Sequence, residues 1–142
     1  MKKDFKIFLV DDDLFSLNFN RQELENIGYD DISLYLNGTA CLNNLYLKPD
    51  IVFLDHNMDI MTGFEVLKKI KRFNPEINVI ILSAQETIKT AVDALKYGAF
   101  DYIIKGDDEI TKMNNAIERI VNIREEIKKA NPTLIQKLLS FF

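Results

Sequence analysis

Four short apolar runs alternate along the chain with longer segments that have helical periodicity. The runs are IFLV (7–10), IVFL (51–54), VIIL (79–82) and YII (102–104). Runs of this length that are rich in β-branched residues are typical of strands covered on both faces, as in a parallel sheet. A fifth stretch, ISLYL (32–36), alternates between apolar and more polar residues, which predicts an edge strand with one wetter face.

The segments between these runs predict helices. Residues 14–27, 62–73, 86–96 and 108–129 carry apolar residues at helical spacing, and a shorter helix over about 39–47 is more weakly marked. In the helix over 62–73 the pattern directs Leu67, Ile70 and Phe73 toward the core. The helices over 86–96 and 108–129 each carry one apolar stripe, and only Arg124 interrupts the stripe of the second of them: Ile88, Ala91, Val92 and Leu95; Ile110, Met113, Ile117, Ile120 and Ile127.

Strand and helix alternate five times. This alternation predicts an α/β domain with a doubly wound, five-stranded parallel sheet, helices on both faces and right-handed crossovers. The 142 residues suit one domain, and the stretch KKANP (128–132) is a boundary signal because Asn131 can cap a helix that starts at Pro132. We therefore predict a domain over residues 1–127 and a C-terminal helical extension over residues 128–142.

Composition excludes several classes of function. The formal net charge of −4 argues against a surface for nucleic acid or for an anionic membrane, and no apolar run approaches the roughly 20 residues of a membrane span. With one cysteine, Cys41, and one histidine, His56, the chain has neither an internal disulfide nor a multi-histidine or thiolate metal site. We expect a cytoplasmic location by default, Cys41 as a small core or near-surface residue and His56 as an exposed loop residue.

Polar residues follow the ends of the predicted strands. Ligands of an open parallel α/β sheet bind beyond the carboxyl ends of its strands, so the residues at those ends should converge on one edge. They are Asp11, Asp12 and Asp13 after the first run, Asp55 after the third, Ser83 after the fourth and Lys105 after the fifth. Each could be a helix cap taken alone, but together they predict a binding site.

The charges of this group indicate its ligands. Clustered carboxylates repel one another, and a divalent cation would remove that repulsion. Oxygen ligands without histidine or cysteine suit Mg²⁺, which is commonly held by one or two carboxylates and several waters. Lys105 adds a second positive group that suits phosphate oxygens.

In this order and at this spacing, the strand-end residues resemble the receiver domain of bacterial two-component response regulators. The resemblance covers residues 5 to about 125. It rests on an acidic pair after the first strand, a phospho-accepting aspartate, a Ser-Ala pair, a lysine and an aromatic residue three positions before that lysine. These are Asp11 and Asp12, Asp55, Ser83 and Ala84, Lys105, and Tyr102.

The resemblance implies a flavodoxin-like strand order, 2-1-3-4-5, and a specific chemistry. Asp55 would take a phosphoryl group from a phosphohistidine, and the domain would catalyse only its own phosphorylation and dephosphorylation. Mg²⁺, or Mn²⁺ in its place, would be held by Asp11, Asp12, Asp55 and the backbone carbonyl of Asn57. Lys105 and Ser83 would contact the phosphoryl group, and Tyr102 would reorient on activation.

Two positions depart from the family pattern. Asp59 stands four residues after the phosphoacceptor, where the family commonly has proline. Gly106 follows Lys105, where the family usually has a proline with a cis bond, and glycine removes the proline-specific reason for such a bond.

The resemblance also implies protein partners. The phosphodonor would be a sensor histidine kinase or a phosphotransfer protein, and a downstream protein target would bind over residues 86–124. Only about twenty residues follow the core of the expected fifth helix, so we read the sequence as a stand-alone receiver, with the receiver part of a longer DNA-binding regulator as the alternative. One helical face of residues 131–142 is too apolar to remain in water. It would fold back on the domain, form a homodimer contact or bind a partner, and its residues are Leu134, Ile135, Leu138, Leu139 and Phe142.

Three other functions compete with a phospho-accepting receiver. A phosphohydrolase of the haloacid dehalogenase type also uses a strand-end aspartate, but Phe15 occupies the last position of its signature in DDDLF (11–15). A flavodoxin-like flavin binder needs a phosphate-cradling first loop, and these aspartates would repel the phosphate. The third is a pseudo-receiver that only binds proteins, which the departures at Asp59 and Gly106 leave open.

Overall fold

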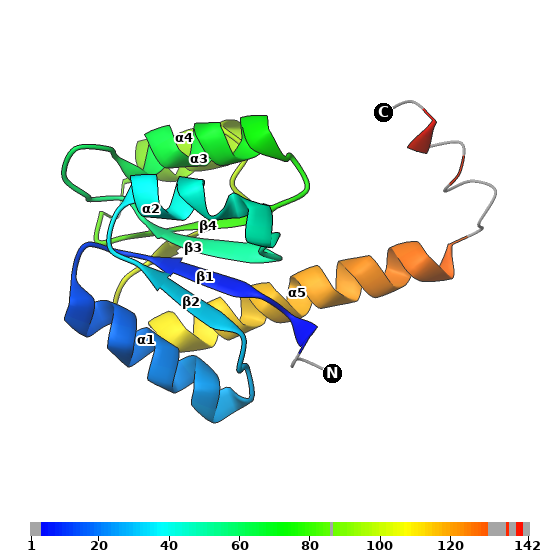
Figure 1. Ribbon diagram of the computed structural model, residues 1–142, viewed down its shortest axis with the longest axis horizontal. Coiled ribbons are helices and arrows are strands. Elements are labelled where there is room, and N and C mark those ends of the chain that lie inside the picture. The colour runs from blue at the N-terminus through cyan, green and yellow to red at the C-terminus, as the bar shows by residue number, and fades with distance from the viewer. Residues whose placement is uncertain (1–3, 86, 131–135, 137–138, 141–142) are drawn as a thin grey trace.

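The computed structural model describes residues 4–85, 87–130, 136, 139 and 140, and in this part of the chain five parallel strands form one sheet. The sheet order is β2-β1-β3-β4-β5 (Figure 1). This confirms the predicted five-stranded parallel sheet and its strand order. The strands are β1 (Ile7–Val10), β2 (Ile32–Tyr35), β3 (Ile51–Asp55), β4 (Asn78–Ser83) and β5 (Asp101–Ile104).

Helices cover both faces of the sheet, as predicted. Figure 1 shows α1 and α5 on one face and α2, α3 and α4 on the other. The weakly marked segment at 39–47 forms two short elements, α2 and a 3-10 helix over Leu45–Leu47. The α-helices are α1 (Leu14–Ile27), α2 (Gly38–Asn43), α3 (Gly63–Phe73), α4 (Ile88–Lys96) and α5 (Glu109–Lys129).

The two layers of helices explain why the strand sequences are apolar without interruption. Successive side chains of a strand point to opposite faces of the sheet. Leu9 and Phe53 pack on the side of α1 and α5, whereas Val10 and Leu54 pack on the side of α2 and α3. Because both faces are covered, every residue of β1 and β3 is buried.

Local hydrogen bonds fix where the helices begin and end. The carboxylate of Asp13 accepts from the backbone N–H of Phe15 at the start of α1, and the hydroxyl of Thr62 accepts from that of Glu65 at the start of α3. Gly28 ends α1 with a φ of 123°, a conformation that favours glycine. Asp13 is therefore a helix cap, and it is not one of the clustered carboxylates described below.

The sequence pattern misplaced Phe73, and the structure places the apolar stripe of α4 on the surface. Phe73 was expected to face the core, but it is the last residue of α3 and is 61% exposed, and Ile77 in the following loop is buried at this end of the layer. The stripe on α4 faces water, with Ile88 81% and Val92 54% exposed, and only Ala94 of this helix is buried. Periodicity identifies an apolar face, but it does not show whether the sheet or the solvent lies opposite.

Arg124 interrupts the apolar stripe of α5 because it makes an ion pair. Its guanidinium lies 2.8 Å from the carboxylate of Asp50 and over the ring of Phe5. Asp50 also accepts from the backbone N–H of Lys6 at 2.7 Å. The pair therefore ties the C-terminal half of α5 to the start of β1 and β3.

The predicted division of the chain at 127/128 falls within α5, which continues to Lys129. The structure does not test the helical extension, because most of its apolar face lies outside the described residues, as do Asn131 and Pro132. None of the described helices combines the length and the apolar character that crossing a membrane requires.

Gly63 allows α3 to begin directly against the end of β3. A methyl group on Gly63 would lie 2.7 Å from the carbonyl oxygen of Asp55 and 2.8 Å from the Cα of His56. Gly63→Ala should therefore lower the free energy of unfolding by about 1 to 3 kcal/mol, because the helix or the strand end must move. Urea denaturation measures this change.

Gly106→Ala is the matched control, since a methyl group there meets nothing within 4 Å. Its free energy of unfolding should be unchanged or slightly raised. Equal losses in the two variants would contradict the close approach at Gly63.

Candidate functional site

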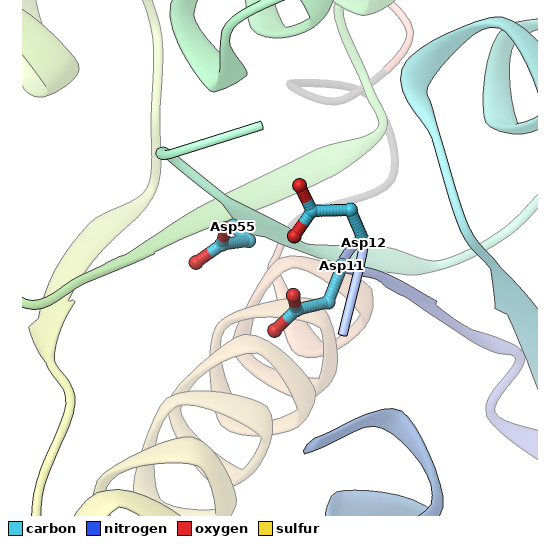
Figure 2. A group of neighbouring side chains, drawn as sticks. All are labelled: Asp11, Asp12 and Asp55. Carbon is cyan, nitrogen blue, oxygen red and sulfur yellow. The ribbon is translucent and has the colours of Figure 1, made fainter. Parts of the chain in front are cut away.

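Three carboxylates from two neighbouring strands face one another at the carboxyl edge of the sheet. Asp11 and Asp12 follow β1, and Asp55 ends β3 (Figure 2). One oxygen atom from each carboxylate lies within 4.8 Å of the others. The structure therefore brings together the acidic residues that the sequence placed at one edge.

Asp55 is the most constrained of these carboxylates. It is 3% exposed, and one of its oxygens makes an ion pair with the ammonium of Lys105, which follows β5. Burial raises the pKa of Asp55 to about 6, the bond to Lys105 opposes this rise, and the negative charge of Asp11 adds to it. The pKa of Asp55 therefore lies closer to neutral pH than that of an ordinary aspartate, although the carboxylate has a cationic partner.

Asp11 and Asp12 differ in their surroundings. Asp11 is buried, accepts from the backbone N–H of Asp13 at 2.9 Å and lies 3.3 Å from the ammonium of Lys105. Asp12 is exposed. The first acidic residue is therefore fixed by the protein, whereas the second faces the other two carboxylates from the solvent-exposed side of the site (Figure 2).

Lys105 supplies the positive charge of the site. Burial lowers the pKa of its ammonium, but the contacts with Asp55 and Asp11 outweigh that effect, and the pKa is raised overall. The backbone N–H of Lys105 donates to the carbonyl of Ser83 at 2.9 Å, which holds the end of β5 against β4. The described residues contain no cis peptide bond, so the link between Lys105 and Gly106 is trans.

The donor set fits a small divalent cation. Three carboxyl groups lie around one ammonium, so acidic groups outnumber basic groups at the cluster. Carboxylate oxygens at this spacing are the ligands that Mg²⁺ and Mn²⁺ take in proteins. Asn57, whose backbone carbonyl was predicted as a further ligand, is an exposed residue of the loop after β3.

A hydrogen-bonded path links Ser83 to Tyr102 through the backbone of Gln85. The hydroxyl of Ser83, which is fully buried, accepts from the N–H of Gln85 at 3.0 Å. The hydroxyl of Tyr102 donates to the carbonyl of Gln85 at 2.6 Å. The sequence pointed to Ser83 and Tyr102 as switch residues, but it held no signal that Gln85 joins them.

His56 is not the exposed loop residue that the sequence suggested. Its ring packs against Phe64 at a centroid distance of 4.3 Å, and its Nδ1 is buried without a hydrogen-bond partner among the described residues. Burial lowers the pKa of this imidazole. The histidine therefore belongs to the packing of α3 against the end of β3.

Ile60 lies in a strained turn on the loop after Asp55. Its φ is 65°, and the N–H of Met61 donates to the carbonyl of Asp59 across it at 2.6 Å. A β-branched residue rarely adopts this conformation, and the Ile60 side chain is fully exposed. The loop in which Asp59 replaces the usual proline thus carries backbone strain that the sequence did not reveal.

The sheet order and the acidic cluster with its lysine define a receiver domain. The chain matches the response regulator receiver domain family over residues 7–118 and belongs to that family. It is therefore a receiver domain of two-component response regulators, as the resemblance implied.

Among curated relatives, the chain is similar to the transcriptional regulatory protein ZraR of Klebsiella oxytoca, with 43% identity over 100 residues, 70% of this chain and 22% of that protein. It is also similar to a protein-glutamate methylesterase/protein-glutamine glutaminase of Clostridium acetobutylicum, with 33% identity over 141 residues, 94% of this chain and 41% of that protein. The chain thus spans less than half of either relative.

Solved structures show the same fold. A response regulator receiver domain protein from Clostridium thermocellum matches with a TM-score of 0.79 and 27% identity, over 87% of this chain and 98% of that one. CheY in the CheX-CheY-BeF3-Mg²⁺ complex from Borrelia burgdorferi matches with a TM-score of 0.75 and 28% identity, over 82% of this chain and 89% of that one.

The raised pKa of Asp55 predicts how the metal-free protein responds to pH. The folded protein binds the Asp55 proton more tightly than the unfolded chain, so this residue costs stability above about pH 6, and the cost falls as the pH decreases toward 4. Asp55→Asn should raise the free energy of unfolding by about 1 to 3 kcal/mol at pH 8 and by much less at pH 4.5. Urea denaturation in EDTA at the two pH values measures this.

Asp59→Asn, which changes an exposed acid of the following loop, is the control and should show no such pH dependence. If Asp55→Asn lowered stability at pH 8, the ion pair with Lys105 would outweigh the cost of burying the carboxylate.

Proposed function

We propose that this receiver takes a phosphoryl group on Asp55 from the phosphohistidine of a sensor histidine kinase or a phosphotransfer protein. The observation that carries the proposal is the setting of Asp55. Its carboxylate is buried at a strand end, contacts Lys105 and lies beside two further carboxylates. This arrangement offers one nucleophile together with the charges that a transferring phosphoryl group requires.

In the proposed reaction an oxygen of Asp55 attacks the phosphorus of the donor. A P–O bond forms while the P–N bond breaks, and the electron pair of the broken bond stays on the donor imidazole. Lys105, which contacts Asp55 before the reaction, would neutralise charge on the phosphoryl oxygens. Ser83 would donate its hydroxyl proton to one of these oxygens once the group is attached.

Asp11, Asp12, Asp55 and the backbone carbonyl of Asn57 would hold Mg²⁺, and Mn²⁺ could take the same ligands. When bound, the cation supplies charge neutralisation for the phosphoryl group. The fit rests on the three clustered carboxylates and on their excess negative charge. Further support comes from the CheY of Borrelia burgdorferi, a relative of 28% identity that was solved with BeF3 and Mg²⁺.

A pseudo-receiver that only binds proteins is the second candidate, and the departures at Asp59 and Gly106 favour it. The acidic cluster and its lysine support the phospho-accepting function instead, since a protein-binding module needs neither. Family membership leaves no ground for the dehalogenase-type hydrolase or the flavin binder.

We also propose where the protein acts and what it binds after phosphorylation. We expect no turnover of an external substrate, a cytoplasmic location and a downstream protein target over residues 86–124. The ZraR proteins are transcriptional regulators, and the aligned region is 22% of their length. A place in a longer DNA-binding regulator is therefore the alternative to binding a separate protein.

Labelling with a small phosphodonor tests the acceptor. With acetyl phosphate and Mg²⁺, the protein should gain the mass of one phosphoryl group, and Asp55→Asn should abolish this gain because the nucleophile is missing. Intact-mass spectrometry measures the product. Asp12→Asn should still be labelled but require more Mg²⁺, because a ligand is lost while Asp55 remains.

Asp59→Asn is the matched control for these carboxylate changes and should be labelled like the unchanged protein. Full labelling of Asp55→Asn would place the acceptor elsewhere. No labelling of the unchanged protein by acetyl phosphate or by a phosphohistidine donor would favour the pseudo-receiver.

The path from Ser83 through Gln85 to Tyr102 provides the proposed switch. Drawing the Ser83 hydroxyl toward the phosphoryl group would break its bond with the N–H of Gln85, whose carbonyl holds Tyr102. Beryllofluoride with Mg²⁺ should therefore shift NMR signals of Gln85, Tyr102 and residues over 86–124. Tyr102→Phe, which removes the hydroxyl, should reduce the shifts beyond residue 86 but not those of the pocket.

Tyr46→Phe changes an exposed tyrosine of the 3-10 helix over Leu45–Leu47, outside the path from Ser83 to Tyr102, and should leave the response intact. Shifts confined to Asp55 and its contacts in the unchanged protein would show that phosphorylation does not switch this surface. A receiver of that kind would pass its phosphoryl group onward.

A further inference from the structure

The side chain of Gln85 reaches α4 through a hydrogen bond with Thr90. The hydroxyl of Thr90 lies 3.2 Å from the side-chain oxygen Oε1 of Gln85 and donates to it. Gln85 stands two residues after the end of β4, and Thr90 is the third residue of α4. This bond is separate from the backbone path between Ser83 and Tyr102, and it ties the loop after β4 to the first turn of the helix.

Thr87 fixes the direction in which the Thr90 hydroxyl points. Thr87 caps α4, and its hydroxyl accepts from the backbone N–H of Thr90 at 3.3 Å. The hydroxyl oxygens of the two threonines lie 2.6 Å apart. Each hydroxyl has one proton, and the proton of Thr90 goes to Gln85, so the bond between the hydroxyls uses the proton of Thr87. The Thr90 oxygen is therefore held by one bond from the helix cap and one bond to Gln85.

Three hydrogen bonds hold Gln85 in the observed arrangement. Its N–H donates to the Ser83 hydroxyl, its backbone carbonyl accepts from Tyr102, and its side-chain oxygen accepts from Thr90. The first two bonds belong to the proposed switch. The third joins the switch to α4 at the surface of the protein, since Gln85 is exposed and Thr90 is half-buried.

The bond with Thr90 opposes a movement of Ser83. A contact made in one of two conformations stabilises that conformation against the other. If Ser83 moved toward Asp55 and residue 85 moved with it, Oε1 would leave the Thr90 hydroxyl. The hydroxyl cannot follow by rotating, because rotation would break its bond with the Thr87 cap. The observed bonds therefore favour the arrangement in which Ser83 contacts Gln85.

We propose that Thr90 is a positioning residue that acts on the phosphoryl site through Gln85 and restrains the switch. Its hydrogen bond holds Gln85, and through Gln85 the Ser83 hydroxyl, in the arrangement that a bound phosphoryl group would disrupt. This inference rests on the proposed phosphorylation of Asp55, and it adds a residue of α4 that sets how readily the site is occupied. Loss of one hydrogen bond of ordinary strength should change that equilibrium about 2- to 10-fold.

The side-chain amide signals of Gln85 test the bond itself, by NMR of the full chain without metal. Thr90→Val removes the hydroxyl but keeps the branched shape, and it should shift these signals. Thr90→Ser keeps the hydroxyl and should leave them close to those of the unchanged protein. Signals that were alike in Thr90→Val and Thr90→Ser would overturn the contact.

Thr111→Val is the matched control for the loss of a hydroxyl. Thr111 is also the third residue of its helix, α5, and it is exposed. Its hydroxyl makes no hydrogen bond within the part of the chain that the structure describes, so the variant should leave the Gln85 signals unchanged.

Titration with beryllofluoride in Mg²⁺ tests the effect on the site. Thr90→Val should lower the half-saturating concentration of beryllofluoride about 2- to 10-fold, measured from the amide signal of Asp55. Thr90→Ser and Thr111→Val should bind like the unchanged protein. Gln85→Ala removes the acceptor and should have the same effect as Thr90→Val, and the double variant should show no further change because both substitutions remove one bond.

The outcomes separate this inference from the proposed function. Equal half-saturating concentrations in Thr90→Val and the unchanged protein would overturn the role of Thr90 while leaving the phosphoryl site intact. A higher concentration in Thr90→Val would also overturn it, because the bond would then support the switched arrangement. If none of these proteins bound beryllofluoride, the phosphoryl site itself would be contradicted, and the role of Thr90 with it.

Discussion

The contact between Asp55, Lys105 and Asp11 is the interaction on which the candidate site depends. A carboxylate that is 3% exposed is costly to ionise, and its neighbour Asp11 increases that cost. Lys105 follows β5, on the other side of β4 from these carboxylates, and its ammonium offsets their charge by reaching the ends of β3 and β1. The parallel sheet makes this possible because it aligns the carboxyl ends of strands that are distant in sequence. Gly63 has no side chain, which lets the start of α3 lie directly against the backbone of Asp55 at the end of β3.

The same edge of the sheet connects the site to the surface of the protein. Ser83 and Lys105 are joined through the backbone, and Gln85 links the Ser83 hydroxyl to Tyr102. A group that attracted Ser83 would therefore act on residues that border α4. The outward-facing apolar stripe of α4 gives this border a surface suited to another protein. Site chemistry and partner binding would then depend on one short hydrogen-bonded path.

Sequence reasoning recovered the fold because the signals for it are local. Uninterrupted apolar runs predict strands that helices cover on both faces, and polar residues that can cap a helix, such as Asp13, predict where helices begin. It predicted that Asp11, Asp12, Asp55 and Lys105 converge, because parallel strands bring their carboxyl ends together. It failed for Phe73 and for His56, and it left the orientation of the α4 stripe undecided, since each of these depends on which distant element lies opposite. Periodicity within a helix carries no information about that element.

The sequence by itself determined the order of strands and helices, the chemical character of each strand end and the family to which the chain belongs. Only the tertiary structure decided that Asp11 is buried while Asp12 is exposed, and that Arg124 pairs with Asp50 instead of facing water. The physical reason is the range of the interactions. Local conformation follows from residues within a few positions along the chain. Burial, ion pairing and the pKa of Asp55 follow from residues that are distant along the chain and become neighbours only in the folded protein.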